Sequence, residues 1–476
     1  MTSAQSAPRH RPADAAPAQP IAATIADFAA GITLDAIPAP VRECAKLHML
    51  DAVGTALAAT RFDFAHRALS GLRGLNEPGF SSLIGFSEKL PLRDAALMNG
   101  ILIHGLDYDD THPEAIVHPT ASTLACALAL GEHVDASGAE LLAAYVAGVE
   151  VATRIGIAAH GAFHTMGFHT TGIAGHLACA NVAGRLLGLN APQIVMAQGI
   201  AGSTAAGSGE YRADGAWTKR MHPGWAAVGG ITAAALARGG FTGPKSVYEG
   251  ADGLFRGHAG ANLARTDLAQ LTAQLGERWV IEEVAVKPFP ICHILHACAD
   301  SALALRRKHN LQPSQIREVR ALLHPESFHY VAEPPALRRR PPTDYVAKFS
   351  VQYVVAACLV RGRFGFAELE PDALADAAIL DMAERVSHDV DPDSAFPRYF
   401  SGGVVVRTTD GRELVHMEKV NRGAGDRQLT ADEICDKFAQ NAGLAVSSGR
   451  ADEIRAAVLG TEQLTARELM RALGGR

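Results

Sequence analysis

The chain has 476 residues, more than a single hydrophobic core usually spans, so two domains are expected. Hydrophobic residues make up 48% and charged residues 20%, which is ordinary for a globular protein. The formal net charge of −6 argues against nucleic acid or an anionic membrane as the main partner.

The N-terminal residues 1–20 are rich in Ala and Pro and lack the apolar segment of a signal peptide, so we expect a disordered tail. Seven cysteines at irregular spacing do not form a disulfide framework. No uninterrupted apolar run of about 18 residues is present. We therefore expect a cytoplasmic protein without a membrane partner.

From residue 21 to residue 279 the apolar residues recur at helical spacing, with turn signals between the runs. Asn190 followed by Pro192 is typical of a helix start, and Pro119 suits a first helical position. Strand-like alternation is almost absent, so an all-helical domain is predicted. The expected helices are 21–31, 40–59, 92–105, 119–133, 139–160, 171–187, 192–207 and 225–237.

After Arg278 the sequence contains segments rich in β-branched residues, which favour strands. A turn at Asp410-Gly411 joins two such segments and predicts a hairpin. Residues 280–422 are therefore predicted to form a smaller α+β domain. Its expected strands are 280–287, 316–324 and the hairpin 403–420, and its expected helices are 293–308 and 345–360.

The end of the chain returns to a helical pattern. Thr430 with Glu433, and Thr465 with Glu468, have the capping-box spacing that opens helices. The predicted fold is mainly α, with an α+β lid inserted before the C-terminal helices. Its predicted parts are a helical domain (21–279 and 423–476) and the lid domain (280–422).

Four carboxylates, a threonine and two histidines lie between Gly105 and Pro119, directly after an apolar run. Such groups beside a core helix cost stability unless they are paired or functional. One interpretation is a Mg²⁺-dependent diphosphate lyase that uses Asp107, Asp109 and Asp110. The other is a proton-transfer site around the Thr111 and His118 side chains, and a hydrated helix end is the structural alternative.

Two later segments carry histidines or cations beside expected helices. His169, in Gly-Phe-His-Thr-Thr-Gly, precedes a helix whose N-terminus attracts anions. Lys219, Arg220 and His222 come directly before another expected helix. Cations are unfavourable there unless an anion lies between them, which a bound carboxylate would explain.

A further basic segment lies at the expected domain boundary. Lys287 is followed by His293 and His296, whose spacing on a helix could bind a metal, although no acidic ligand is adjacent. The chain has no phosphate loop and no Gly-x-Gly-x-x-Gly after a strand. The surplus of cations favours an anionic polycarboxylate, and proton transfer next to a carboxylate needs a base with cationic groups nearby. Together these features predict a cofactor-free lyase or isomerase.

Five stretches, in this order, resemble the MmgE/PrpD family, and the resemblance runs from about residue 22 to residue 420. The family's known members include 2-methylcitrate dehydratase, cis-aconitate decarboxylase and iminodisuccinate epimerase. The resemblance implies a large helical domain with a smaller α+β lid, usually as a homodimer. The stretches are His-Gly-Leu-Asp-Tyr-Asp-Asp-Thr-His, Gly-Phe-His-Thr-Thr-Gly, Asp-Gly-Ala-Trp-Thr-Lys-Arg-Met-His-Pro-Gly-Trp-Ala, Lys-Pro-Phe-Pro-Ile-Cys-His and Ala-Lys-Phe-Ser-Val-Gln-Tyr.

The resemblance also implies roles for individual residues. His118 is the expected proton-transfer residue, oriented by Asp107. The position after the boundary lysine stays open among Cys292, His293 and His296. No metal and no cofactor are expected. The implied catalytic residues are His118, Asp107, Thr111, His169 and Lys219, and the implied substrate-binding residues are Lys287, His293 and Tyr330.

We therefore expect a cofactor-independent lyase acting on a di- or tricarboxylate, with elimination of water of the 2-methylcitrate dehydratase type as the first expectation. Decarboxylation of the cis-aconitate decarboxylase type, or epimerisation of a related acid, is the alternative within the family. A non-catalytic carboxylate-binding protein is a further alternative. The expected partners are a small polycarboxylate and a second copy of the chain in a homodimer, and not nucleic acid.

Overall fold

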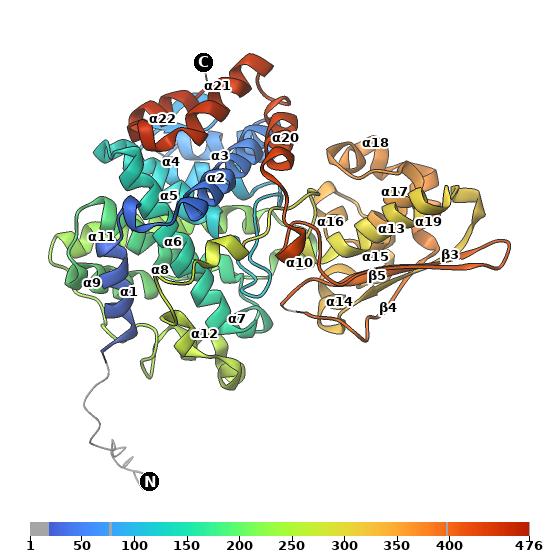
Figure 1. Ribbon diagram of the computed structural model, residues 1–476, viewed down its shortest axis with the longest axis horizontal. Coiled ribbons are helices and arrows are strands. Elements are labelled where there is room, and N and C mark those ends of the chain that lie inside the picture. Colours follow the sequence, from blue (N-terminus) through green and yellow to red (C-terminus); the bar gives the residue numbers. More distant parts are fainter. Residues whose placement is uncertain (1–18, 76–78, 397, 476) are drawn as a thin grey trace, which may run out of the picture.

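The computed structural model describes residues 19–75, 79–396 and 398–475. The predicted disordered tail, except residues 19 and 20, lies outside the described residues. Figure 1 shows a helical body beside a smaller part that contains a sheet, and the C-terminal helices return to the helical body. The predicted mainly α fold with a small α+β part is confirmed.

The helical body contains every helix predicted for this region. Helix α8 begins after His169, and Asn190 with Gln193 forms a capping box at the start of α9. Two boundaries differ most from the prediction. Helix α9 ends at Gly202 instead of residue 207, and α11 begins at Thr218 instead of residue 225. The helices are α1 (Ile21–Gly31), α2 (Ala39–Ala59), α3 (Asp63–Arg73), α4 (Leu92–His104), α5 (Pro119–Val134), α6 (Gly138–Ala159), α7 (Ala162–Thr165), α8 (Thr170–Leu186), α9 (Ala191–Gly202), α10 (Tyr211–Asp214), α11 (Thr218–Arg238) and α12 (Leu254–Ala259).

Two expectations about strands were wrong. The helical body is not purely helical, because β1 (Ser81–Leu83) and β2 (Phe86–Leu90) form an antiparallel hairpin. Residues 280–287 do not form a strand, and Val280–Glu283 is a 3-10 helix instead. The buried Glu150 carboxylate accepts the Ile281 backbone N–H (3.0 Å), so α6 supplies the partner that a neighbouring strand would have supplied.

The α+β part is built on a four-stranded sheet of order β4-β3-β5-β6, in which β3 and β4 are parallel and the other pairs antiparallel. The predicted strand and hairpin are confirmed. Helices α13 and α17 pack on the sheet. The strands are β3 (Ile316–Leu323), β4 (Val386–Val390), β5 (Gly402–Thr408) and β6 (Glu413–Glu418), and the helices are α13 (His296–His309), α14 (Phe328–Val331), α15 (Pro335–Arg339), α16 (Asp344–Ala347), α17 (Val351–Arg361), α18 (Pro371–Leu374) and α19 (Ala377–Glu384).

The chain ends in α20 (Ala431–Ala442), α21 (Ser448–Leu459) and α22 (Ala466–Leu473). The capping boxes predicted at Thr430 and Thr465 are present. Helix α20 packs on α2, and α22 packs on α5. The C-terminal helices therefore share the core of the helical body, as Figure 1 shows.

Buried apolar side chains form two clusters. One draws on residues 22–284 and 438–473, and the other on residues 289–406. Helix α6 is long and apolar enough to cross a membrane by length and composition, but its most apolar window is wholly buried inside the protein. Such burial is what a core helix shows.

Candidate active site

The loop between α4 and α5 carries the acidic segment, and it is buried. Asp107 is 2% exposed, and its backbone adopts the left-handed conformation (φ 53°), which Asp tolerates better than most residues. Lys219 Nζ donates to one Asp107 carboxylate oxygen and Lys287 Nζ to the other, each at 2.7 Å. Burial alone would raise the pKa of Asp107, but the two ammonium groups hold it well below its usual range. Asp107 is therefore an ionised carboxylate shared by two lysines.

This pairing changes the interpretation of the cations near α11. Lys219 and Arg220 lie in the first turn of α11, not before the helix. The anion that offsets Lys219 is the carboxylate of Asp107 rather than a ligand. Lys219 and Lys287 thus face the site with half of their charge already neutralised.

Three buried lysines from distant parts of the chain hold the same loop by its backbone carbonyls. The loop follows the C-terminus of α4, where carbonyls lack helical partners and the helix dipole favours cations. Each lysine satisfies one of three successive carbonyls. The bonds run from Lys348 Nζ to Leu106 O (2.6 Å), from Lys287 Nζ to Asp107 O (2.8 Å) and from Lys437 Nζ to Tyr108 O (2.8 Å).

His118 ends this loop and faces the site. Its Nδ1 donates to the Asp110 carbonyl (2.8 Å), which leaves Nε2 as the nitrogen with a free lone pair. The Thr111 hydroxyl lies 3.1 Å from the same Nδ1. Asp107 does not orient His118 as predicted, because its carboxylate comes no nearer than 4.0 Å. Burial lowers the pKa of His118 well below its usual range, so the imidazole is neutral.

Three further histidines stand beside His118, and the four together are called the histidine wall. His104 Nδ1 lies 2.8 Å from an Asp109 carboxylate oxygen. His169, the N-cap of α8, has its Nδ1 3.1 Å from Nδ1 of His222. Burial lowers the pKa of His169 well below its usual range and that of His222 to about 4. Three of the four buried imidazoles in the wall, those of His118, His169 and His222, therefore have lowered pKa values and are largely uncharged.

Asp107, His118 and His169 are among the residues that enclose a chamber of about 60 Å³ between the helical body and the α+β part. The volume holds only a few waters. All eight of the predicted site residues line it, although they come from five separate segments. They are Asp107, Thr111, His118, His169, Lys219, Lys287, His293 and Tyr330.

The structure also distinguishes the three candidates after the boundary lysine. Cys292 and His293 line the chamber, and His296 does not. His293 Nε2 accepts a hydrogen bond from the Asn421 side-chain amide (2.6 Å). Within the described residues, His293 and His296 belong to no group of three side chains that could hold a metal ion. The alternative of a metal site at this pair is not supported.

Arg212, on α10, also lines this chamber, although no motif in the sequence indicated it. Its guanidinium carbon lies 4.8 Å from the ring centre of Tyr330 and 5.5 Å from that of Tyr211. Its Nη1 is buried without a hydrogen-bond partner among the described residues. Aromatic faces can hold a guanidinium in place while leaving its N–H groups free. Arg212 is thus a cation of the chamber that has no carboxylate partner among the described residues.

His164 and Tyr330 form the side of the chamber that faces a larger hollow. Their ring centres lie 4.6 Å apart, and burial lowers the pKa of His164 to about 3. The outer hollow has a volume of about 430 Å³ and shares Ile116, His164 and Tyr330 with the chamber. These three side chains separate the two spaces.

Two models of one protein family together match most of the chain. The MmgE/PrpD N-terminal domain matches residues 23–266, and the MmgE/PrpD C-terminal domain matches residues 289–463. The chain belongs to the MmgE/PrpD family. The resemblance found from the sequence motifs is thus confirmed.

Curated relatives align with most of the chain. Cis-aconitate decarboxylase-like protein oryM of Aspergillus oryzae is 27% identical, covering 94% of this chain and 96% of that protein. A cis-aconitate decarboxylase of Aspergillus terreus is 28% identical and covers 94% of each chain. The cis-aconitate decarboxylase of Mus musculus is 28% identical, covering 83% of this chain and 81% of that enzyme. These matches support a lyase of the MmgE/PrpD family.

Proposed function

We propose that this protein is a cofactor-independent lyase that decarboxylates an unsaturated tricarboxylate of the cis-aconitate type. The names of its relatives support this alternative better than the 2-methylcitrate dehydratase that was our first expectation. The observation that carries the proposal is the chamber itself. It places an unpaired guanidinium and a lysine-paired carboxylate around an imidazole with a free Nε2.

The charges of the chamber suit a substrate with more than one carboxylate. Nη1 of Arg212 has no hydrogen-bond partner among the described residues, and guanidinium N–H groups bind carboxylates strongly in a buried site. Lys219 and Lys287 together carry one charge more than Asp107 neutralises. In the proposed complex one substrate carboxylate binds Arg212 and a second lies against the two lysines.

The proposed reaction breaks the carbon–carbon bond to one carboxylate, and CO₂ leaves. The electron pair of that bond passes through the adjacent double bond toward a carboxylate that stays on the substrate, where nearby cations stabilise the charge. A proton then adds to carbon, so each turnover consumes one proton. His118 Nε2 is the proposed donor of that proton.

His118 must be protonated to act as this acid, although its pKa is low in the free protein. Bound carboxylates oppose that shift, because a nearby negative charge raises a histidine pKa. In the proposed cycle His118 therefore takes up its proton together with the substrate. Calorimetry in two buffers of different ionisation enthalpy measures this proton uptake directly.

The decisive experiment incubates the purified protein with a panel of di- and tricarboxylates, including cis-aconitate, and follows the product masses. Loss of CO₂ is the expected result. Loss of water from 2-methylcitrate would instead establish a dehydratase, and deuterium exchange without mass loss an epimerase. Tight binding with no turnover across the panel would indicate a binding protein.

The His118→Gln variant tests the assignment of the proton donor. It keeps a side-chain amide near the Asp110 carbonyl but removes the titratable nitrogen. We expect turnover to fall by about 10²–10⁴-fold, the usual contribution of a positioned acid or base. Full activity on the true substrate would remove His118 from the mechanism.

A further inference from the structure

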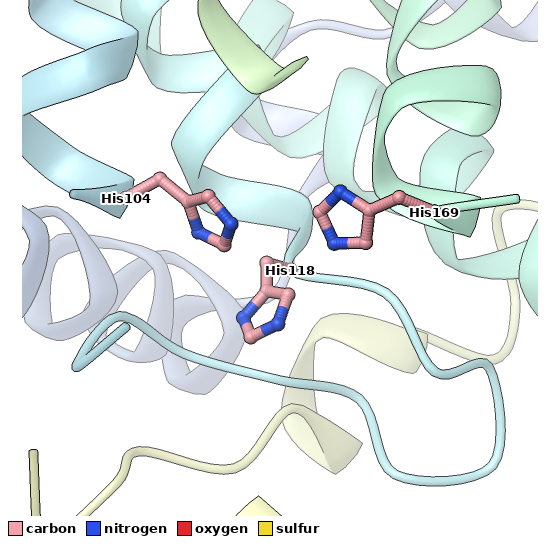
Figure 2. Close-up of side chains that lie close together, drawn as sticks. All are labelled: His104, His118 and His169. Carbon is pink, nitrogen blue, oxygen red and sulfur yellow. The ribbon is translucent and has the colours of Figure 1, made fainter. Parts of the chain in front are cut away.

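Three imidazoles of the histidine wall lie close together. His104 is the last residue of α4, His118 precedes α5, and His169 precedes α8. Figure 2 shows the three rings lying close to one another. One potential ligand atom from each residue lies within 4.8 Å of those of the other two. All three side chains are buried.

The hydrogen bonds set the direction of the free lone pairs. His118 Nδ1 donates to a carbonyl, and His104 Nδ1 lies against the Asp109 carboxylate, which its neighbours keep ionised. In both rings Nδ1 is therefore already engaged, and Nε2 is the nitrogen that a ligand can reach. Nε2 of His104 and Nε2 of His169 are buried without a hydrogen-bond partner among the described residues. A buried nitrogen without a partner is costly unless a ligand completes it.

We propose that His104, His118 and His169 form a binding site for a divalent transition-metal ion such as Zn²⁺. Neutral imidazole nitrogens are the ligands that these ions favour. The contact between His104 Nδ1 and Asp109 is the carboxylate–histidine arrangement that orients metal ligands. Zinc–nitrogen bonds are about 2.0–2.1 Å long, so small rotations of the three rings bring their nitrogens into range.

The electrostatic surroundings allow a cation at this position. Lys219 and Lys287 would repel it, but both pair with Asp107. Asp109 supplies a second carboxylate directly behind His104. The site differs from the Mg²⁺ site considered from the sequence, because nitrogen ligands replace the three aspartates.

Metal bound here would inhibit the proposed reaction. It would occupy Nε2 of His118, the nitrogen proposed to carry the proton, so the ion is a regulator and not a cofactor. This inhibition rests on the proposed function, whereas the binding itself does not. The two are therefore tested separately.

The experiment treats the whole protein with EDTA, removes the chelator and titrates Zn²⁺ against a fluorescent competing chelator. We expect one Zn²⁺ per chain. The His104→Gln and His169→Gln variants should each bind at least about 100-fold more weakly. The Asp109→Asn variant should lose about 10–100-fold in affinity for Zn²⁺, the usual effect of removing a carboxylate that orients a metal ligand.

His176→Gln is the matched control, because His176 is also a buried histidine of α8 with an unpartnered Nε2 but lies outside the cluster. Its affinity for Zn²⁺ should equal that of the unmodified protein. Absorption of bound Co²⁺ gives a second measurement on any variant that folds, since nitrogen coordination changes the visible spectrum.

Equal affinity in the unmodified protein and both cluster variants, or no binding by the unmodified protein, would overturn the proposal. Zn²⁺ binding without any lyase activity would leave the metal site standing and remove the proposed function. Lyase activity that bound Zn²⁺ does not reduce would overturn the inhibitory role alone.

Discussion

The loop from Leu106 to Tyr108 and the histidine wall both contribute to the chamber, through Asp107 in the loop and through His118 and His169 in the wall. The two regions differ in how their polar groups are hydrogen-bonded. Each of the three loop carbonyls accepts a hydrogen bond from a different buried lysine. In the wall, Nε2 of His104 and Nε2 of His169 have no partner among the described residues. The protein itself supplies hydrogen-bond partners for the loop carbonyls, whereas these two wall nitrogens remain available to a ligand.

This difference in hydrogen bonding assigns separate roles to the two regions: the loop contacts contribute to stability, and the wall contributes to ligand binding. Satisfied carbonyls and paired charges fix the position of Asp107 before any substrate arrives, so little reorganisation is needed on binding. Neutral histidines and the unpaired Arg212 keep their hydrogen-bonding capacity for the ligand. Substitutions in the loop supports should therefore cost stability, and substitutions in the wall or at Arg212 should cost affinity.

The largest expected effect on stability comes from Lys437→Met. Lys437 pairs with the buried Asp51 carboxylate (2.6 Å) as well as holding the Tyr108 carbonyl. Removing one partner of a buried ion pair costs about 3–5 kcal/mol, because the other charge stays buried alone. Urea unfolding followed by circular dichroism measures the free energy of unfolding.

The double variant Lys437→Met with Asp51→Leu is the control for this prediction. It removes both charges, and replacing a buried pair by apolar groups is often close to neutral. We expect it to recover most of the lost stability. A double variant as unstable as the single one would show that the carbonyl contact, not the ion pair, carries the effect.

Arg212→Gln should produce the opposite pattern. The free energy of unfolding should stay within about 0.5 kcal/mol, because no ion pair within the described residues is lost. The KM for a tricarboxylate should rise about 10- to 150-fold, which corresponds to the 1.5–3 kcal/mol of a hydrogen bond to a charged group. Steady-state kinetics beside urea unfolding separates the two effects.

Arg265→Gln is the matched control, since Arg265 is an exposed arginine of the outer hollow. Its KM should stay near that of the unmodified enzyme. If both substitutions raise KM equally, the effect is a general electrostatic one, and Arg212 is not the residue that binds the substrate carboxylate.

Lys348→Met should cost less stability than Lys437→Met, about 1–3 kcal/mol. Burial lowers the pKa of Lys348 to about 7, so this lysine is partly neutral near neutral pH. Its loss leaves the Leu106 carbonyl without its donor but leaves no carboxylate buried alone. Urea unfolding of the two variants side by side tests the order, and an equal or larger loss in Lys348→Met would contradict it.

Local signals in the sequence predicted much of the fold. Asn190 with Gln193, and Thr465 with Glu468, cap their helices as the spacing indicated. The 3-10 helix at residues 280–283 was missed because its partner is Glu150, which is distant in sequence. Local propensity cannot show that a distant side chain provides the hydrogen bond that a neighbouring strand would otherwise provide.

For the site too, local motifs indicated residues, but contacts between distant segments could not be predicted. The motifs supplied the residues that line the chamber, but not the pairing that joins Asp107 to Lys219 and Lys287. Arg212 was missed because the sequence near it has no motif, and its role follows from the two tyrosine rings that hold it. Contacts between segments more than a hundred residues apart became visible only in the fold.

The smallest expected effect is a change in how the free energy of unfolding depends on pH. It tests whether His222, a member of the histidine wall, is neutral in the folded protein. Burial, His104 and Lys219 lower the pKa of His222 to about 4, below the usual value of about 6.5 in the unfolded chain. The folded protein then binds fewer protons than the unfolded one between these values. This contribution to stability is complete above about pH 6.5 and is lost as the pH falls toward 4, by about 1.4 kcal/mol per pH unit for each such histidine.

His222→Gln removes one titrating group and keeps an amide beside His169. The free energy of unfolding should therefore fall less steeply with acidification in this variant, by about 1.4 kcal/mol between about pH 6 and about pH 5. The exposed His66 provides the control, since His66→Gln should follow the unmodified protein. Parallel curves for all three proteins would mean that the pKa of His222 is the same in the folded and the unfolded protein. His222 would then take up a proton near the usual histidine pKa of about 6.5, and the contrast between the paired loop and an uncharged His222 would have to be abandoned.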